Sequence, residues 1–214
     1  MKNKSKLILP VCSASLFALL ILLVKTAGVE PTGVGDTKIG LYGLNRAVHE
    51  FFGINDAWYK ITEITGLLSL ACCGLFALIG LIQLIKRKSL LKVDKEILAL
   101  GGLYAVTGAL YVLFEKVIIN YRPLIMAGET APEASFPSSH TVLVLVIIGS
   151  IVMIISKYVK NQTAVYIIKA LCAAIAVITV IGRLISGVHW LTDILGGVLL
   201  SVFLLSSYYA IIKE

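Results

Sequence analysis

Residues 182–212 read GRLISGVHWLTDILGGVLLSVFLLSSYYAII, and they give the clearest indication of the fold class. From residue 190 onward it is a nearly continuous apolar run, interrupted by Asp193 and by small or hydroxyl side chains. A helix that crosses the hydrocarbon core of a bilayer needs about 20 such residues. Residues 190–212 are therefore predicted to span a membrane, with polar residues clustered where the helix begins.

The composition of the whole chain indicates the same class of protein. Its 214 residues are 58% hydrophobic and 14% charged, with a mean hydropathy of +0.95. Soluble domains average about 45–50% apolar and about 25% charged residues. This argues against a soluble enzyme, a disordered chain and a secreted disulfide scaffold. All four cysteines lie inside apolar runs, which is typical of membrane-helix residues rather than of disulfides or metal ligands.

Apolar runs of membrane-spanning length occur six times along the chain. They cover about residues 7–28, 62–85, 97–119, 138–156, 163–183 and 190–212. The predicted fold is all-α: a bundle of six transmembrane helices, with residues 1–214 forming a single integral membrane domain. The first run also has features of a signal peptide, but its length favours a retained membrane anchor.

Basic residues predict the orientation of the bundle. The net charge is +7, and Lys and Arg gather at the N-terminus, around residues 86–95, around 157–160 and at Lys213. Short basic links stay in the cytoplasm, so both termini are expected on the cytoplasmic side of the inner membrane. We interpret the positive charge as a topology signal, and no nucleic-acid partner is expected.

The first outward link, about residues 29–61, is long and contains an amphipathic segment within residues 39–59. Its apolar side chains recur at helical spacing, at Leu41, Leu44, Val48 and Phe51. This predicts a helix in the outer membrane interface, with Trp58 and Tyr59 at headgroup level. An ordinary packed loop is the alternative, and His49 is interpreted as a histidine of this loop or lid.

Two groups of polar residues lie at the outward ends of the third and fourth spans. The first group, residues 115–123, contains Arg122, whose planar guanidinium matches phosphate oxygens, although snorkelling at a membrane boundary also explains it. The second group is residues 136–140, FPSSH. Ser138 or Ser139 is a predicted N-cap, and the free N–H groups of a helix start bind anions. His140 follows in the first turn, where it can exchange a proton; simple capping beside a surface histidine is the alternative.

The third group, residues 182–193, enters the last span. His189 and Asp193 are four residues apart and share a helix face. Asp193 is expected to accept the proton of one imidazole nitrogen and to leave the other nitrogen free; a purely structural His–Asp pair is the alternative. Two arginines, a helix start and two histidines on one face of the membrane indicate phosphoryl transfer through a phosphohistidine.

At these residues the sequence resembles the type 2 phosphatidic acid phosphatase (PAP2) superfamily of membrane lipid phosphatases. The family's motifs are K-x6-R-P, P-S-G-H and S-R-x5-H-x3-D. Within residues 115–193 the matches, in order, are Arg122-Pro123, Pro137-Ser138-Ser139-His140 and Arg183-x5-His189-x3-Asp193. The sequence departs from these motifs at three places: Glu115 stands at the lysine position with Lys116 one residue late, Ser139 replaces the glycine, and Gly182 replaces the serine before Arg183.

The resemblance implies a role for each matching residue. His189 attacks phosphorus, Asp193 orients His189, and His140 protonates the leaving oxygen. The implied phosphate-binding residues are Arg122, Arg183, Ser138, Ser139 and, more weakly because it is out of register, Lys116. No metal and no cofactor are expected, and the partners are a membrane lipid phosphate and the bilayer.

These features predict a metal-independent lipid phosphatase with its active site at the extracytoplasmic face. Candidate substrates are phosphatidic acid, phosphatidylglycerophosphate and undecaprenyl pyrophosphate. One alternative is a phosphotransferase that passes the phosphate to another lipid or to a sugar. The other is a non-catalytic lipid-binding or transport protein, which is disfavoured because the charged groups lie at span ends rather than near the midplane.

Overall fold

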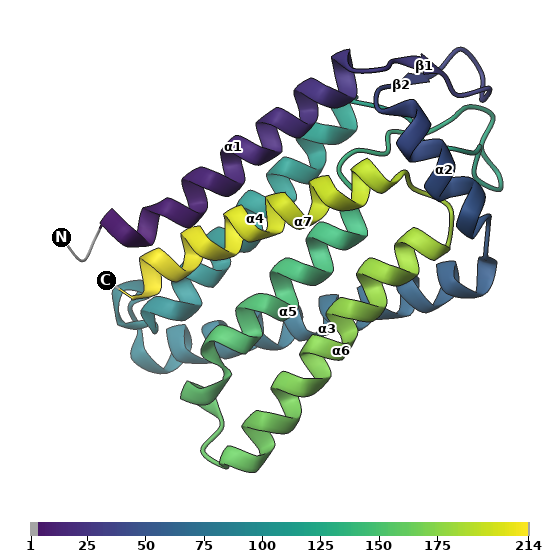
Figure 1. Cartoon of the computed structure of the whole chain (residues 1–214). Coiled ribbons are helices and arrows are strands. Elements are labelled where there is room, and N and C mark those ends of the chain that lie inside the picture. Colours follow the sequence, from purple (N-terminus) through teal and green to yellow (C-terminus); the bar gives the residue numbers. More distant parts are fainter. Residues whose placement is uncertain (1–3, 214) are drawn as a thin grey trace.

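The computed structural model describes residues 4–213 and is a bundle of long helices (Figure 1). Six of them are long and apolar enough to cross a membrane. They are α1 (Lys4–Thr26), α3 (Asp56–Arg87), α4 (Lys95–Lys116), α5 (Ser139–Tyr158), α6 (Gln162–Ile185) and α7 (Leu191–Ile212). The predicted all-α bundle of six membrane helices is thus confirmed.

Short elements occupy the links between these helices. A small antiparallel pair, β1 (Glu30–Pro31) and β2 (Lys38–Ile39), precedes α2 (Tyr42–Phe52), and a 3₁₀ turn, η1 (Leu90–Lys92), joins α3 to α4. The amphipathic segment therefore does form a helix, α2. It ends before Trp58 and Tyr59, which belong to α3 instead.

The start of α3 differs from the sequence prediction by six residues, Asp56 instead of residue 62. Asn55 is the reason, because its side chain accepts a hydrogen bond from Trp58 N at 3.1 Å and so caps the helix. The extra turns bring Trp58, Tyr59 and Thr62 into the bundle as helical residues. They matter because this part of α3 faces the candidate site.

Helix α5 lies at the centre of the bundle, in contact with α3, α4, α6 and α7. Its Val144 and Val146 side chains are fully buried. Large apolar side chains on the outer helix faces, such as Ile64 and Ile85, are exposed instead, as expected of surfaces that face lipid. Because α5 begins with Ser139 and His140, its central position puts these residues between the surrounding helices.

The start of α1 and the end of α7 lie at one end of the bundle (Figure 1). The Lys6 ammonium donates to the carbonyl oxygen of Lys213 at 2.9 Å, which joins α1 to the end of α7. Links 27–55, 117–138 and 186–190 lie at the opposite end, which we call the site end. The candidate site residues come from these links and from the helix turns next to them.

Candidate active site

The link between α6 and α7 carries His189 into the interior of the site end. Gly187 makes this turn with φ +70°, and a Cβ there would lie 2.1 Å from the carbonyl oxygen of Gly53, so only glycine fits. His189 Nδ1 lies 3.4 Å from Oδ2 of Asp193, in the first turn of α7. The two side chains are 2% and 0% exposed. The i, i+4 spacing has therefore brought the histidine and the carboxylate together, as expected.

Helix α2 holds this link in place from the outside. His49 Nε2 lies 3.0 Å from the carbonyl oxygen of Gly187, and its ring packs against Trp190 with centroids 5.4 Å apart. Asn45 is fully buried and accepts a hydrogen bond from Thr192 N at 3.1 Å. His49 therefore supports the backbone on either side of His189 from outside the cavity.

Two residues outside the sequence prediction complete the surroundings of Asp193. Asn120 donates to Oδ1 at 2.8 Å, and the Ser135 hydroxyl donates to Oδ2 while lying 3.2 Å from His189 Nδ1. Trp190 N also donates to Oδ2, at 2.9 Å. Each acceptor oxygen is thus hydrogen-bonded, as a buried carboxylate requires. Asn120 lies inside the polar group 115–123, two residues before Arg122, so the sequence could have indicated it as a site residue. Nothing in the sequence indicated Ser135.

The second imidazole nitrogen of His189 faces Arg122. Nε2 lies 3.5 Å from Nη1 of Arg122, and the same Nη1 donates to the carbonyl oxygen of Val188 at 3.3 Å. Burial lowers the pKa of His189 to about 4, and the positive charge of Arg122 acts in the same direction. His189 is therefore a neutral base at pH 7. Glu133 forms an ion pair with Arg122 through Nε at 3.0 Å and fixes the guanidinium from the other side.

The start of α5 supplies His140. Ser138 holds the N-cap position but is fully buried, and its hydroxyl accepts a hydrogen bond from Thr141 Oγ1 at 3.0 Å rather than capping the helix. Ser138 N donates to the carbonyl oxygen of Asp193 at 3.0 Å, which ties α5 to α7. Ser139 and His140 both line the cavity described below, whereas Ser138 does not.

Arg183 and His140 are connected by a residue of α3, Glu63. Its Oε1 lies 2.7 Å from Nη2 of Arg183 and 3.0 Å from Nε2 of His140. Arg183 is 1% exposed, and its Nε and Nη1 atoms have no hydrogen-bond partner within the described part of the chain. A buried guanidinium with free donors favours an anionic ligand, because unpaired buried donors are costly.

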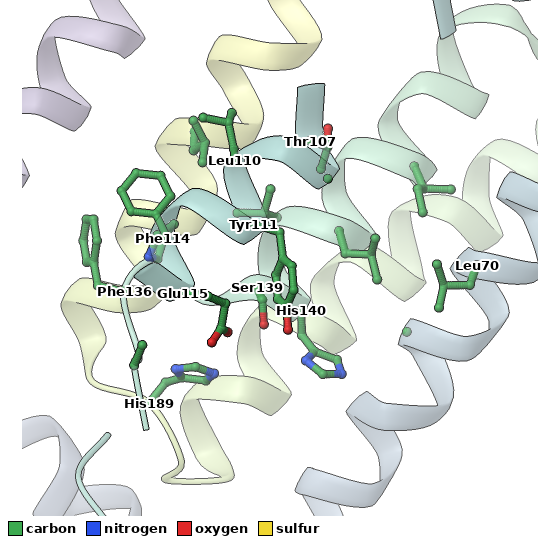
Figure 2. Close-up of a pocket in the computed structure, with 18 of the residues that line it drawn as sticks. Leu70, Thr107, Leu110, Tyr111, Phe114, Glu115, Phe136, Ser139, His140 and His189 are labelled. Atoms are coloured by element: carbon green, nitrogen blue, oxygen red, sulfur yellow. The ribbon is translucent and has the colours of Figure 1, made fainter. Parts of the chain in front are cut away.

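A cavity of about 510 Å³ opens beside Glu63 and His140 and continues along α3, α4 and α5, and Arg183 lies behind Glu63 rather than among its lining residues. His140 and His189 lie at its polar end, while Leu70, Leu110 and Phe114 belong to its apolar wall (Figure 2). Arg122 also lines the cavity. On α3 the lining residues run from Glu63 to Cys73, which is about 15 Å along a helix. In residues 4–213 no group of three or more His, Cys, Asp or Glu side chains is arranged to hold a metal ion.

Comparison with known proteins agrees with this architecture. The sequence model of the PAP2 superfamily matches residues 96–214, more than half of the chain. The chain belongs to the PAP2 superfamily. Its fold is similar to the crystal structure of the first transmembrane PAP2-type phosphatidylglycerolphosphate phosphatase from Bacillus subtilis, with a TM-score of 0.68, 19% sequence identity and 94% of each chain covered. No curated protein sequence matches the chain.

The three departures from the PAP2 motifs have different places in the structure. Glu115, at the lysine position, lines the cavity, whereas Lys116 is exposed at the end of α4 and does not. Ser139, at the glycine position, is half-buried in the cavity wall. Gly182, at the serine position, packs against α3, where a Cβ would lie 2.7 Å from Thr62 Cγ2. The phosphate-binding roles of Arg122, Arg183, Lys116, Ser138 and Ser139 stay predictions.

Proposed function

We propose that this PAP2 protein hydrolyses the phosphate or pyrophosphate of a membrane lipid through a phosphohistidine on His189. The observation that carries the proposal is the arrangement of the His189 ring. Nδ1 faces Ser135 and Asp193, and Nε2 faces Arg122 at the polar end of an apolar cavity. A neutral imidazole with one nitrogen held and the other directed at an anion-binding group is a nucleophile for phosphorus.

In the first step, the lone pair of His189 Nε2 attacks phosphorus, and the bond from phosphorus to the leaving oxygen breaks. The leaving oxygen takes a proton from His140, and Asp193 stabilises the positive charge that develops on the His189 ring. In the second step, water attacks phosphorus, transfers a proton to His140 and breaks the phosphorus–nitrogen bond. Free phosphate leaves and both histidines return to their first states.

Arginine donors support the phosphate-binding part of the proposal. Arg183 has two buried donor atoms without a protein partner, and Arg122 lines the cavity within 3.5 Å of the nucleophilic nitrogen. Guanidinium groups bind phosphate oxygens in a planar, often bidentate geometry. The backbone N–H groups at the start of α5 add partial positive charge, with Ser139 in the cavity wall.

A lipid substrate is supported by the shape of the cavity. Its wall is formed mainly by apolar residues of three membrane helices, and it extends about 15 Å from the site towards the middle of the bundle. An acyl or prenyl chain fits such a wall while the phosphate stays at headgroup depth. The similar Bacillus subtilis structure belongs to a phosphatidylglycerolphosphate phosphatase, which adds weight to that lipid among the three candidates.

The positions of basic residues support an outward-facing site in the inner membrane. Lys and Arg are concentrated near the start of α1, at Lys213 and in the links around residues 86–95 and 157–160, at the end of the bundle opposite to the site. Basic links remain cytoplasmic, so the site end faces outward. Exposed apolar residues of α2, Leu44 and Phe51, would then lie at the outer membrane interface.

The test is phosphate release by purified protein in detergent, with EDTA present. Phosphatidic acid, phosphatidylglycerophosphate and undecaprenyl pyrophosphate are the three lipids, and His189→Ala is the matched variant. We expect release that EDTA does not affect and that falls by at least about 10⁴-fold in the variant, the scale of losing a nucleophile. Equal release by His189→Ala would exclude the phosphohistidine. Transfer of phosphate to an added alcohol without free phosphate would indicate the phosphotransferase instead.

A further inference from the structure

Glu63 is a charged residue of the site that lies outside the PAP2 motifs. A single oxygen of its carboxylate contacts both His140 Nε2 and Arg183 Nη2, at 3.0 and 2.7 Å. It also lines the cavity beside His140. A carboxylate near the start of an apolar membrane helix is costly unless it is paired, and these two contacts are its pairing.

Close packing of α3 against two neighbouring helices positions Glu63. At Gly182 of α6, a Cβ would lie 2.7 Å from Thr62 Cγ2, and at Gly66 of α3 it would lie 3.1 Å from His140 Cδ2. These two glycines let α3 approach both α6 and the His140 ring. Glu63 is one turn before Gly66, on the same helix face, and therefore lies between Arg183 and His140.

Tyr59 continues the same face of α3 one turn earlier. The Arg183 guanidinium carbon lies 5.2 Å from the centre of the Tyr59 ring, within the range of a cation–π contact. The guanidinium is thus held between the ring and the Glu63 carboxylate, while its Nε and Nη1 atoms stay available. Arg183 can therefore bind a phosphate oxygen without releasing Glu63.

The contact to His140 decides which ring nitrogen does the chemistry. Nε2 is engaged by Glu63, and Nδ1 has no hydrogen-bond partner among the residues that the structure describes. This arrangement parallels that of His189, whose Nδ1 is held by Ser135 and Asp193 and whose Nε2 faces Arg122. In each case a carboxylate fixes one nitrogen and leaves the other for the substrate.

We propose that Glu63 is a positioning residue for His140. Its carboxylate accepts a hydrogen bond from Nε2–H, and Nδ1 therefore delivers its proton to the leaving oxygen. This inference rests on the proposed function. The positive charge of the neighbouring Arg183 guanidinium disfavours a protonated imidazole at His140. The negative charge of Glu63 offsets this effect.

The proton balance of the reaction follows from this assignment. The doubly protonated His140 ring donates Nε2–H to Glu63 and Nδ1–H to the leaving oxygen as the bond from phosphorus to that oxygen breaks. The neutral ring keeps its Nε2 proton, which stays hydrogen-bonded to Glu63, and its Nδ1 now carries a lone pair. That lone pair accepts the proton of the water that hydrolyses the phosphohistidine, which restores the starting state.

The experiment compares two leaving groups in the variant Glu63→Gln. Phosphatidic acid releases a strongly basic alkoxide that needs the proton of His140, whereas p-nitrophenyl phosphate releases a weakly basic phenolate that does not. We expect kcat/KM, which covers the transfer of phosphate to His189 but not the later hydrolysis, to fall by about 10- to 100-fold with phosphatidic acid. With p-nitrophenyl phosphate it should fall by less than about 3-fold, because its leaving group needs no general acid. His140→Ala should show the same selectivity with a larger loss.

Glu115→Gln is the matched control. It removes an equal charge from the same cavity, and within the described residues Glu115 forms no hydrogen bond or ion pair with either histidine, unlike Glu63. We expect it to change the rates with both substrates by the same factor. If Glu63→Gln also lowers both rates equally, or lowers neither, the positioning role is wrong. If the wild-type protein releases phosphate from no substrate, it is the proposed function that fails.

Combining variants gives a second readout with phosphatidic acid alone. Residues that act through one another are non-additive, so adding Glu63→Gln to His140→Ala should cost less than about 3-fold more. If the loss in the double variant equals the product of the two single losses, Glu63 acts independently of His140, which overturns the proposal. If Glu63→Gln does not fold, Glu63→Asp keeps the charge but is one methylene shorter, and the same leaving-group selectivity is expected of it.

Discussion

The two histidine–carboxylate pairs of the site are built in opposite ways. His189 and Asp193 are four residues apart in the chain, and both side chains are almost fully buried, at 2% and 0% exposure. His140 and Glu63 come from two different helices and remain partly open to the cavity, at 26% and 38% exposure. One pair is local and closed, and the other is long-range and open.

The difference fits what each pair has to do in the proposed reaction. A nucleophile benefits from a dry, fixed setting, and the hydrogen bonds from Asn120, Ser135 and Trp190 N make Asp193 rigid. A general acid must instead exchange a proton with the leaving group and with water in each turnover. Partial exposure to the cavity gives His140 that access. The same two side-chain types therefore fit different roles according to burial: the buried pair suits a nucleophile, and the partly exposed pair suits a proton carrier.

The largest effect is expected from breaking the local pair with Asp193→Asn. The amide cannot stabilise a charged imidazole and favours the wrong tautomer, so turnover should fall by about 10³- to 10⁴-fold. The variant also disturbs a buried hydrogen-bond network and should lose about 1–3 kcal/mol of stability. Phosphate release and thermal unfolding measure the two effects. A loss no greater than that of Glu63→Gln would contradict the contrast between the pairs.

An intermediate effect is expected from Arg122→Ala, with Lys116→Ala as its comparison. Arg122→Ala removes a donor next to the nucleophilic nitrogen and should lower kcat by about 10²- to 10³-fold. Lys116→Ala removes an exposed charge outside the cavity and should cost less than about 3-fold. Parallel kinetics on one lipid test this. Equal losses would mean that the end of α4 turns Lys116 into the site when lipid binds.

The smallest effect is expected from acidification. Burial lowers the pKa of His189 to about 4, below its ordinary value of about 6.5. The base is active when neutral, so activity that depends on His189 should persist as pH falls from 7 to 5 and be lost only as pH approaches 4. An ordinary histidine would be only about 3% neutral at pH 5. The pH profile of kcat/KM is the measurement, and a tenfold drop between pH 7 and pH 5 would argue against a buried neutral His189.

Sequence reasoning located the local half of the site and missed most of its long-range half. His189 and Asp193 were predictable because helical spacing alone brings them to one face. Glu63 carried the same signal as Asp193, an acid just inside an apolar span, yet its partners on α5 and α6 are distant in the sequence. Ser135 and Glu133 carried no such signal, because a link without regular structure does not reveal where its side chains point.

Three features could be predicted from the amino-acid sequence alone: the six membrane helices, the end of the bundle that carries the polar residues, and the His189–Asp193 pair. Each of these depends on periodicity and hydrophobicity within one segment. Three other features become visible only in the tertiary structure: Arg183 pairs with Glu63, Nε2 of His140 contacts Glu63, and Asp193 is surrounded by hydrogen-bond donors. These contacts depend on how closely α3 packs at Gly66 and Gly182, and helix packing is a property of whole surfaces rather than of local spacing.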